Sequence, residues 1–508
     1  MTTYQHPSIL DGDAQDARLA ANVHPAGWVN PTPASRYDMV VIGGGTAGLV
    51  CAAGAAGLGA KVALIEKELM GGDCLNVGCV PSKALIHAAR LVADSRRLAR
   101  LASSAPNSTP ADFPAMMEHL RTLRADISAH DSADRFKQLG VDVFMGAGIF
   151  VDGSTVEVAG ARLTFKRAVI ASGARAFLPP IPGLAEAKAF TNETIFTLTS
   201  LPEKMVVIGA GPIGCELAQA FARLGSAVTV LTDGSTILPR EDPDAGKIVE
   251  ESLRQDGVKV ITHAKITAVK RQAAQSLIEL TRQGASEQIS ADAVLIAVGR
   301  APNVEALNLS AAGVEFDLRQ GVKVDACLRT TNKKIFAAGD VCSQYKFTHA
   351  ADALARIVIQ NALFFGRKKA SSLLIPWCTY TTPEVAHVGL TAAAAARNPG
   401  DIQTVYIPMD TVDRAVLDGE GEGFLKVYAD KNKGRILGAT LVGAHAGEMI
   451  SELTVAMTAG VPLGRLGSVI HPYPTQAEII KRAGDAFNRQ RLTPRTAGLL
   501  RFILKLNR

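Results

Sequence analysis

The sequence predicts an α/β fold with two doubly wound, parallel-sheet domains followed by a third domain of α+β type. A strand, glycine-rich turn and helix begin at Tyr37, and the same succession returns at Lys204. After Pro376, strand-like runs at 424–429 and 436–443 precede a helical run at 446–458. The length of 508 residues is enough for about three domains.

The first copy of the repeat has the residue spacing of a phosphate-binding turn. A buried strand at 37–42 leads into Gly43-Gly44-Gly45-Thr46-Ala47-Gly48, a helix to about Gly59 and a second strand at 61–66. In a G-x-G-x-x-G turn the glycines allow a tight turn, close approach of a pyrophosphate and helix packing. Free N–H groups at the helix start face the phosphates, and an acid ending the second strand accepts from ribose hydroxyls. The predicted contacts are Gly43, Gly45, Thr46, Ala47, Gly48, Glu66 and Lys67.

The second copy repeats this pattern and predicts a second dinucleotide-binding site. A strand at 204–208 precedes Gly209-Ala210-Gly211-Pro212-Ile213-Gly214, a helix to about Leu224 and a strand at 227–231. NAD sites usually carry an acid at the end of the second strand, and NADP sites carry a nearby arginine. Thr232 occupies that place, Asp233 follows, and no arginine comes before Arg240. The pattern therefore favours NADH over NADPH, with predicted contacts at Gly209, Gly211, Pro212, Ile213, Gly214, Thr232 and Asp233.

Two cysteines follow the first copy closely. Cys74 and Cys79 are separated by four residues, which brings two sulfurs within bonding distance if the segment is a slightly distorted helix. A thiolate near a helix N-terminus is stabilised and reactive. Two buried free thiols and half of a zinc site are the alternatives, but no further cysteine or histidine stands at matched spacing. The other five cysteines are scattered, which excludes a secreted disulfide framework.

The run from Gly71 to Lys83 resembles the redox-active segment of the class I pyridine nucleotide-disulfide oxidoreductases, which include dihydrolipoyl dehydrogenase, glutathione reductase and mercuric reductase. The resemblance covers about residues 36–490. It implies FAD in the first turn, NADH or NADPH in the second, and a homodimer. It also implies that Cys79 lies against the flavin, that Cys74 is the outer interchange thiol, and that Lys83 sits near flavin N5. Glu216 would pair with Lys83; the alternative for Glu216 alone is a solvated helix charge.

The resemblance supplies the remaining FAD contacts. Ala168–Gly173 resembles the strand and turn that close the first FAD segment, and Arg329–Asp340 resembles the last FAD fingerprint. Asp340 would accept from a ribityl hydroxyl, the alternative being a turn-forming role after Gly339. The implied set is Gly72, Asp73, Lys83, Ala171, Ser172, Gly173, Gly339, Asp340, Thr348, His349 and Ala350, and Gly299 and Arg300 are predicted to bind a cofactor as well.

A C-terminal segment departs from the dithiol-handling members of the family. Those members carry His-Pro-Thr-x-x-Glu, whose histidine is the general base for the substrate thiol. Here Tyr473 takes that place, His471 stands two residues earlier and Glu478 is kept. A tyrosine with a pKa near 10 is a poor base at neutral pH. Tyrosine at this place resembles mercuric reductase, yet no cysteine follows Cys378, whereas that enzyme has a C-terminal cysteine pair.

The expected organisation is an N-terminal extension at 1–35, an FAD-binding domain at 36–186 and 309–375, an NAD(P)-binding domain at 187–308 and a dimerisation domain at 376–508. The favoured function is a mercuric reductase-like NAD(P)H oxidoreductase that passes hydride through flavin to the Cys74–Cys79 disulfide. Its acceptor would be a metal ion or a small disulfide or electrophilic oxidant. A dihydrolipoyl dehydrogenase acting on lipoyl proteins and a non-catalytic redox sensor are the alternatives. No resident metal is expected.

The composition limits which classes of binding partner and which cell compartment are expected. The net charge of +6 suits anionic nucleotides and is too diffuse to indicate nucleic acid. The N-terminus lacks an apolar core with basic flanks, and no apolar run reaches the length of a membrane span. Cytoplasm is therefore the expected location. The tail from Leu499 to Leu506 is apolar and basic and could contact a membrane surface or a partner, although packing against its own dimer is the simpler interpretation.

Overall fold

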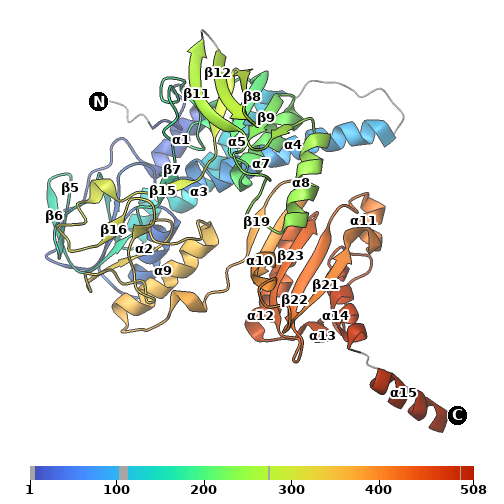
Figure 1. The fold of residues 1–508 in the computed structure, drawn as a ribbon. Coiled ribbons are helices and arrows are strands. Elements are labelled where there is room, and N and C mark those ends of the chain that lie inside the picture. Colours follow the sequence, from blue (N-terminus) through green and yellow to red (C-terminus); the bar gives the residue numbers. More distant parts are fainter. Residues whose placement is uncertain (1–5, 102–111, 273–274, 492–493, 508) are drawn as a thin grey trace. The chain divides into compact units, whose positions relative to one another are not determined.

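The computed structural model describes residues 6–101, 112–272, 275–491 and 494–507. The chain divides into two compact units (Figure 1). Unit 1 contains Met1–Asp233 and Gly257–Leu373, and unit 2 contains Gly234–Asp256 and Leu374–Arg508.

The first sheet of unit 1 has the strand order β3-β2-β1-β6-β5-β4, and β18 also pairs with β6. The neighbours β3, β2, β1, β6 and β18 are parallel, and Val41 of β1 pairs with Leu64 on one side and Val169 on the other. Helices α2 and α9 pack together in the hydrophobic core on this sheet. The bounds are β1 Tyr37–Ile42, β2 Val62–Glu66, β3 Val141–Met145, β4 Ile149–Asp152, β5 Thr155–Val158, β6 Ala161–Ile170, β18 Ile335–Ala337, α2 Thr46–Gly57 and α9 Thr348–Leu363.

The second sheet of unit 1 is the parallel sheet β10-β9-β8-β14, beside a three-stranded antiparallel sheet β11-β12-β13. Both strand–turn–helix repeats predicted from the sequence are therefore present, and the α/β fold is confirmed. The bounds are β8 Lys204–Ile208, α7 Pro212–Leu224, β9 Ala227–Leu231, β10 Lys259–Ile261, β11 Lys265–Gln272, β12 Gln275–Arg282, β13 Ala285–Ala291 and β14 Ala293–Ile296.

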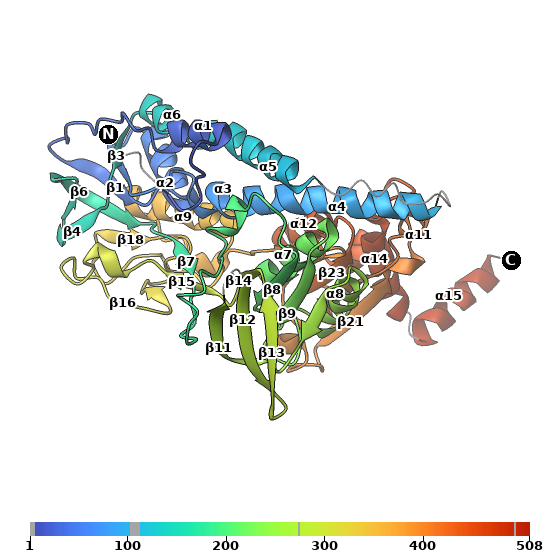
Figure 2. The ribbon, with the colours of Figure 1, turned by 90° about the horizontal axis from the view of Figure 1, so that it is seen from above.

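The N-terminal extension is built into unit 1 through α1 (Ala14–Val23), whose Leu19 and Val23 are completely buried. Helix α1 lies along α5 (Phe113–Ser128), which in turn lies along α4 (Cys79–Leu101), as Figure 2 shows. Arg124 of α5 forms a buried ion pair with Asp16. The same guanidinium donates to the carbonyl of Asn76, the last residue of α3 (Gly72–Asn76), at 2.8 Å. The extension is thereby linked to the end of α3, which the sequence did not predict.

Unit 2 is built on the antiparallel sheet β19-β20-β23-β22-β21, on which α12 and α14 pack. This is the α+β arrangement predicted after Pro376. No helix among the described residues is long and apolar enough to cross a membrane. The bounds are α8 Pro243–Gln255, β19 Trp377–Thr379, β20 Glu384–Gly389, α10 Ala392–Ala395, β21 Ile402–Pro408, α11 Asp413–Asp418, β22 Phe424–Asp430, β23 Ile436–Gly443, α12 Ala446–Ala459, α13 Leu463–Leu466, α14 Glu478–Gln490 and α15 Pro494–Leu506.

Short elements complete unit 1. Strand β7 pairs with β15, so that the segment after Gly173 and the segment after Gly299 lie side by side. The remaining bounds are α6 Ala133–Gln138, β7 Ala174–Ala176, β15 Arg300–Pro302, β16 Phe316–Asp317 and β17 Gly321–Val322.

Candidate active site

The glycine turn between β1 and α2 leaves no room for side chains. A Cβ on Gly43 would lie 2.3 Å from the carbonyl oxygen of Ala171, and Gly43 has a φ of +107°. A Cβ on Gly48 would lie 1.8 Å from the carbonyl oxygen of Gly43. The first and third glycines of the motif are therefore required by the backbone itself, because the turn, the helix and β6 are in direct contact.

The turn between β8 and α7 has the same construction. A Cβ on Gly209 would lie 2.4 Å from the carbonyl oxygen of Ala297, and one on Gly214 would lie 2.1 Å from that of Gly209. A Cβ on Gly211 would meet nothing within 4 Å. The middle glycine therefore borders open space, which is where the motif places the approaching pyrophosphate.

Helices α2 and α7 both begin without a side-chain cap. Their N-cap residues, Gly45 and Gly211, are extended and make no capping hydrogen bond from a side chain. The N–H groups of a first helical turn lack partners within the helix and carry the positive end of the helix dipole. Each helix start can therefore hold a phosphate group, and both cradles fit the dinucleotides that the sequence predicts.

Glu66, at the end of β2, is buried and holds the first turn in place. Its Oε2 accepts from the Gly44 amide at 2.5 Å, and its Oε1 accepts from the Glu68 amide at 2.7 Å. Burial raises the pKa of this carboxyl, and the two amide hydrogen bonds oppose that rise. Lys67 is paired with Glu68 at 2.8 Å on the surface. Glu66 thus stands at the strand end where the sequence predicts a ribose contact.

Three of the predicted cofactor-binding residues, Asp73, Arg300 and Asp340, meet in one ion-pair group although their segments are far apart in the sequence. Arg300 binds Asp73, and its Nε lies 3.6 Å from Oδ2 of Asp340. It also donates to the Ala174 carbonyl at 2.6 Å. Burial raises the pKa of the Asp340 carboxyl, and Arg300 opposes that rise. This group joins α3, the turn after β18 and β15.

The cysteine pair is divided between two helices, which corrects the expectation of a single distorted helix. Cys74 lies within α3, and Cys79 is the first residue of α4. The break falls at Val77 and Gly78, where a Cβ on Gly78 would lie 2.7 Å from the carbonyl oxygen of Asp73. All seven cysteines are free thiols. The break brings the start of α4 to Cys79, where a helix N-terminus stabilises a thiolate.

The two thiols have opposite acidities. A hydrogen bond from Cys74 lowers the pKa of Cys79 to about 6, with further lowering by Thr348 and Lys83 against the effect of burial. The Oγ1 of Thr348 lies 3.5 Å from Sγ of Cys79. The pKa of Cys74 is raised by the same hydrogen bond and by burial. In the reduced pair Cys79 therefore carries the thiolate and Cys74 the proton.

Lys83 and Glu216 form the ion pair that the resemblance implies. Nζ of Lys83 lies 2.9 Å from Oε2 of Glu216, whose side chain is 6% exposed. Lys83 follows Cys79 by about one turn of α4, and Glu216 follows Gly214 in α7. The pair thus connects the dithiol helix to the helix of the second cradle, and Glu216 is not a solvated helix charge.

The C-terminal candidates lie in unit 2. Tyr473 is 71% exposed, and its hydroxyl donates to Asp413 at 2.8 Å, which raises the tyrosine pKa. His471 contacts Glu452 through Nε2 at 3.1 Å and the Val469 carbonyl through Nδ1 at 3.2 Å. Glu478, at the start of α14, accepts from Arg482 at 3.2 Å. Both ring nitrogens of His471 are therefore engaged within this unit.

Several predicted residues have local partners. The Thr232 amide donates to the carbonyl of Ile261. The Ser172 hydroxyl donates to the carbonyl of Asn303 at 2.7 Å. The ring of His349 stacks on that of Phe347, with 5.4 Å between the ring centroids. The sequence did not predict the contact between Thr348 and Cys79 or the bridge that Arg300 makes. Pairing across segments leaves no local sequence signal in a single chain.

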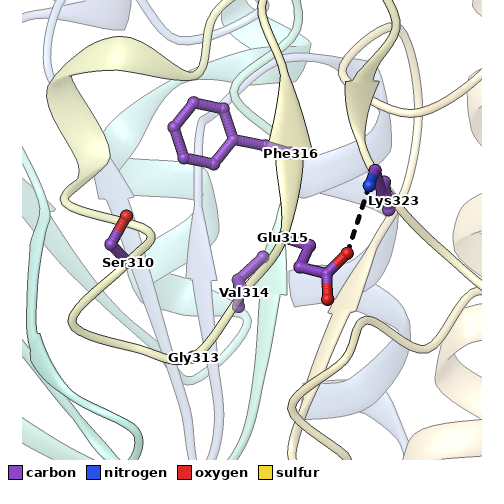
Figure 3. A pocket seen from close by; sticks show the side chains of 6 residues that line it. All are labelled: Ser310, Gly313, Val314, Glu315, Phe316 and Lys323. Atoms are coloured by element: carbon purple, nitrogen blue, oxygen red, sulfur yellow. Dashed lines mark hydrogen bonds and ion pairs between the residues drawn. The ribbon is translucent and has the colours of Figure 1, made fainter.

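A hollow elsewhere in unit 1 contains none of the predicted site residues. Figure 3 shows its lining, in which Glu315 and Lys323 form an ion pair at 3.1 Å. The described part of the chain contains no group of three or more His, Cys, Asp or Glu side chains arranged to hold a metal ion. The lining consists of Ser310, Gly313, Val314, Glu315, Phe316 and Lys323.

Two phosphate cradles and an asymmetric dithiol within one unit define an oxidoreductase of the class that couples two dinucleotides to a cysteine pair. Comparison with protein families agrees. The model described as pyridine nucleotide-disulphide oxidoreductase matches residues 37–355, and that family's dimerisation domain matches residues 375–484. The chain belongs to the pyridine nucleotide-disulphide oxidoreductases. It is an FAD-dependent enzyme of this family, whose members use FAD and NAD(P)H, and the dimerisation domain indicates a homodimer.

The individual relatives are named for different activities. The chain is 35% identical to a mercuric reductase of Lysinibacillus sphaericus over 89% of its own length and 83% of the relative. It is 34% identical to the dihydrolipoyl dehydrogenase of Bacillus subtilis over 88% of its own length and 96% of the relative. A solved Cu(II) complex of the HOCl-induced flavoprotein disulfide reductase RclA from Escherichia coli is 30% identical, with a TM-score of 0.78 over 87% of this chain and 98% of that one.

Proposed function

We propose that this protein is a mercuric reductase-like NAD(P)H oxidoreductase whose acceptor is a thiol-binding metal ion or a small electrophilic or disulfide oxidant. The observation that carries the proposal is the Cys74–Cys79 pair, in which one thiol is acidic and the other is protonated. The mercuric reductase relatives and the Cu(II) complex of the RclA structure support the same class of acceptor.

Each part of the site then has a task. The turn at Gly43 to Gly48 binds FAD, and the turn at Gly209 to Gly214 binds NADH in preference to NADPH. Bound FAD supplies the chemistry that accepts hydride from the nicotinamide and reduces the disulfide. Cys79 faces this cofactor, while Cys74 is the outer thiol that meets the acceptor. The Lys83–Glu216 pair orients the lysine between the two cradles.

Electrons and protons balance over one cycle. NADH loses a hydride, whose two electrons and one proton convert the S–S bond between Cys74 and Cys79 into the Cys74 thiol and the Cys79 thiolate. Two electrons then pass from the pair to the acceptor, the S–S bond forms again and the proton of Cys74 leaves. The acceptor is thereby reduced by two electrons: Hg(II) becomes Hg(0), two Cu(II) become two Cu(I), or a small disulfide becomes two thiols.

The groups at 471–473 favour a metal or small oxidant over a lipoyl substrate. Dithiol–disulfide exchange with a lipoyl group needs a base that removes the proton of the substrate thiol. The pKa of Tyr473 is raised by its hydrogen bond to Asp413, so even less of this tyrosine than of a free one is deprotonated and able to accept a proton at neutral pH. His471 is held by Glu452 and the Val469 carbonyl.

An acceptor screen on the purified FAD-bound protein tests this proposal. Steady NADH oxidation is measured with Hg(II), Cu(II), a small disulfide and lipoamide, using the wild type, Cys74→Ser and Tyr473→His. The expected result is turnover with a metal ion or small oxidant that Cys74→Ser abolishes, and little turnover with lipoamide.

Two outcomes would contradict the proposal. Lipoamide turnover above that of every other acceptor in the wild type would indicate a dihydrolipoyl dehydrogenase, consistent with the relative from Bacillus subtilis. Negligible turnover with all acceptors, despite a disulfide that NADH reduces, would indicate a redox sensor.

A further inference from the structure

The helix α15 exposes an apolar face. Leu499, Phe502, Ile503 and Leu506 stand at the helical spacing i, i+3, i+4 and i+7, and their exposed fractions are 59%, 59%, 44% and 69%. Leu500 and Leu504 widen this face and are exposed as well. Contiguous apolar surface of this kind marks a site of contact with a membrane or another molecule.

The charge around this helix has one sign. The last 23 residues, 486–508, contain no Asp or Glu and six basic residues, which is as much positive charge as the net charge of +6 of the whole chain. The rest of the chain is therefore neutral overall. Arg501 and Lys505 are one helical turn apart and lie between Phe502 and Leu504, on the side of the helix opposite Ile503 at the centre of the apolar face. The basic residues are Arg489, Arg491, Arg495, Arg501, Lys505 and Arg508.

A second copy of this helix is a poor occupant of its apolar face. Two copies of α15 would bring together the same positive charge, and like charges repel at close range. The match to the family's dimerisation domain ends at residue 484, so α15 lies outside the part that family members share for dimerisation. An anionic surface, in contrast, complements both the basic residues and the apolar face.

We propose that α15 is an amphipathic helix that binds the surface of a membrane rich in anionic phospholipid. Such helices lie in the interface with their apolar face among the acyl chains, while basic side chains contact the headgroups. Leu499, Phe502, Ile503 and Leu506 enter the lipid, and Arg501 and Lys505 contact phosphate. The helix holds the reductase at the membrane surface without crossing the bilayer.

Vesicle sedimentation of the full-length, FAD-bound protein tests this binding. Vesicles of phosphatidylcholine alone are compared with vesicles that also contain phosphatidylglycerol, at low and high salt. The wild type is expected to bind the anionic vesicles at least about tenfold more tightly, with loss at high salt. Arg501→Glu with Lys505→Glu, and separately Phe502→Ser with Ile503→Ser, should each abolish binding.

The matched control is Lys333→Glu with Lys334→Glu, which makes the same charge change at two exposed residues far from α15 in the sequence. This control should bind like the wild type. Equal binding to both kinds of vesicle, or retained binding by the Arg501/Lys505 variant, would overturn the proposal. Dissociation of the homodimer into monomers by the Phe502/Ile503 variant would also overturn it, because α15 would then pack between copies. The readout is binding, so it does not depend on which acceptor the enzyme reduces.

Discussion

Lys83 and Glu216 are 133 residues apart in the sequence, yet Nζ of one lies 2.9 Å from Oε2 of the other. The pair ties the helix that begins at Cys79 to the helix that begins beside the second phosphate cradle. Lys83 also lowers the pKa of Cys79, whereas Glu216 raises it. One contact therefore links the acidity of the dithiol to the nucleotide site.

Glu216→Gln should slow reduction of the bound flavin by NADH by about tenfold, because the amide leaves Lys83 without its charged partner. Hydrogen bonds to charged groups contribute about 1.5–3 kcal/mol, and partial exposure of Lys83 places this pair at the low end. Stopped-flow absorbance measures the rate. Glu250→Gln, which affects an exposed i,i+4 pair with Arg254, is the control and should leave the rate unchanged. An unaltered rate in Glu216→Gln would show that the Lys83–Glu216 ion pair does not support the reduction of flavin by NADH.

The acidity of Cys79 predicts how alkylation depends on pH. Its pKa is depressed to about 6, so the reactive thiolate dominates at neutral pH and is lost as pH falls through about 6. Iodoacetamide modification of the Cys79 peptide in the reduced protein, followed by mass spectrometry, should show this midpoint. Cys74→Ala removes the largest cause of the depression and should move the midpoint upward towards that of an ordinary thiol.

Thr348 provides the matched variants for the same measurement. Thr348→Val removes the hydroxyl that lies 3.5 Å from the Cys79 sulfur and should raise the midpoint. Thr348→Ser keeps the hydroxyl and should leave it near the wild-type value. A midpoint that is the same in wild type, Cys74→Ala and Thr348→Val would show that neither hydrogen bond sets the acidity.

The glycine turns predict separate losses of the two cofactors. Gly48→Ala would place a Cβ 1.8 Å from the Gly43 carbonyl, so the protein should be purified with little FAD. The Cβ of Gly214→Ala would lie 2.1 Å from the carbonyl oxygen of Gly209. This variant should retain FAD and lose most of the reduction of its flavin by NADH. Bound flavin is counted by absorbance, and NADH reduction is followed anaerobically. Gly57→Ala, whose Cβ would meet nothing within 4 Å, should retain both.

The buried pair between Asp16 and Arg124 predicts a contribution of the N-terminal extension to stability. Both side chains are 1% exposed, so Asp16→Ala leaves a buried guanidinium without its partner. The cost should be about 3–5 kcal/mol in the free energy of unfolding. Asp126→Ala breaks the exposed pair with Arg18 and should cost at most about 1 kcal/mol. Denaturant unfolding compares the variants, and equal losses would mean that the buried pair adds nothing beyond a surface pair.

The local parts of the fold could be predicted from the sequence. The strand at 37–42, the strands at 204–208 and 227–231 and the strand at 436–443 have the predicted bounds, because each is a short apolar run ended by glycine or by a polar residue. Gly43 and Gly209 have positive φ values of 107° and 109°. Glycine adopts such values without strain, so the glycines in the sequence predict where these turns lie.

Contacts between distant segments could not be predicted from spacing. Four residues between Cys74 and Cys79 are compatible with one helix, and only the close packing of Gly78 on the Asp73 carbonyl explains the break between α3 and α4. Arg300 forms ion pairs with Asp73 and Asp340, which lie in two other segments of the chain. No local sequence pattern indicates which charged residues pair across such distances. The Asp16–Arg124 pair follows from the packing of α1 on α5, which polar residues in an N-terminal extension do not reveal.

The central claim is that NADH reduces a disulfide between Cys74 and Cys79 through bound FAD, and counting thiols tests it most directly. The air-oxidised protein is treated anaerobically with one equivalent of NADH, denatured and titrated with Ellman's reagent. The wild type should show two more thiols per chain after NADH than before, and Cys74→Ser should show no increase. An unchanged thiol count in the wild type, with the flavin reduced, would contradict the account.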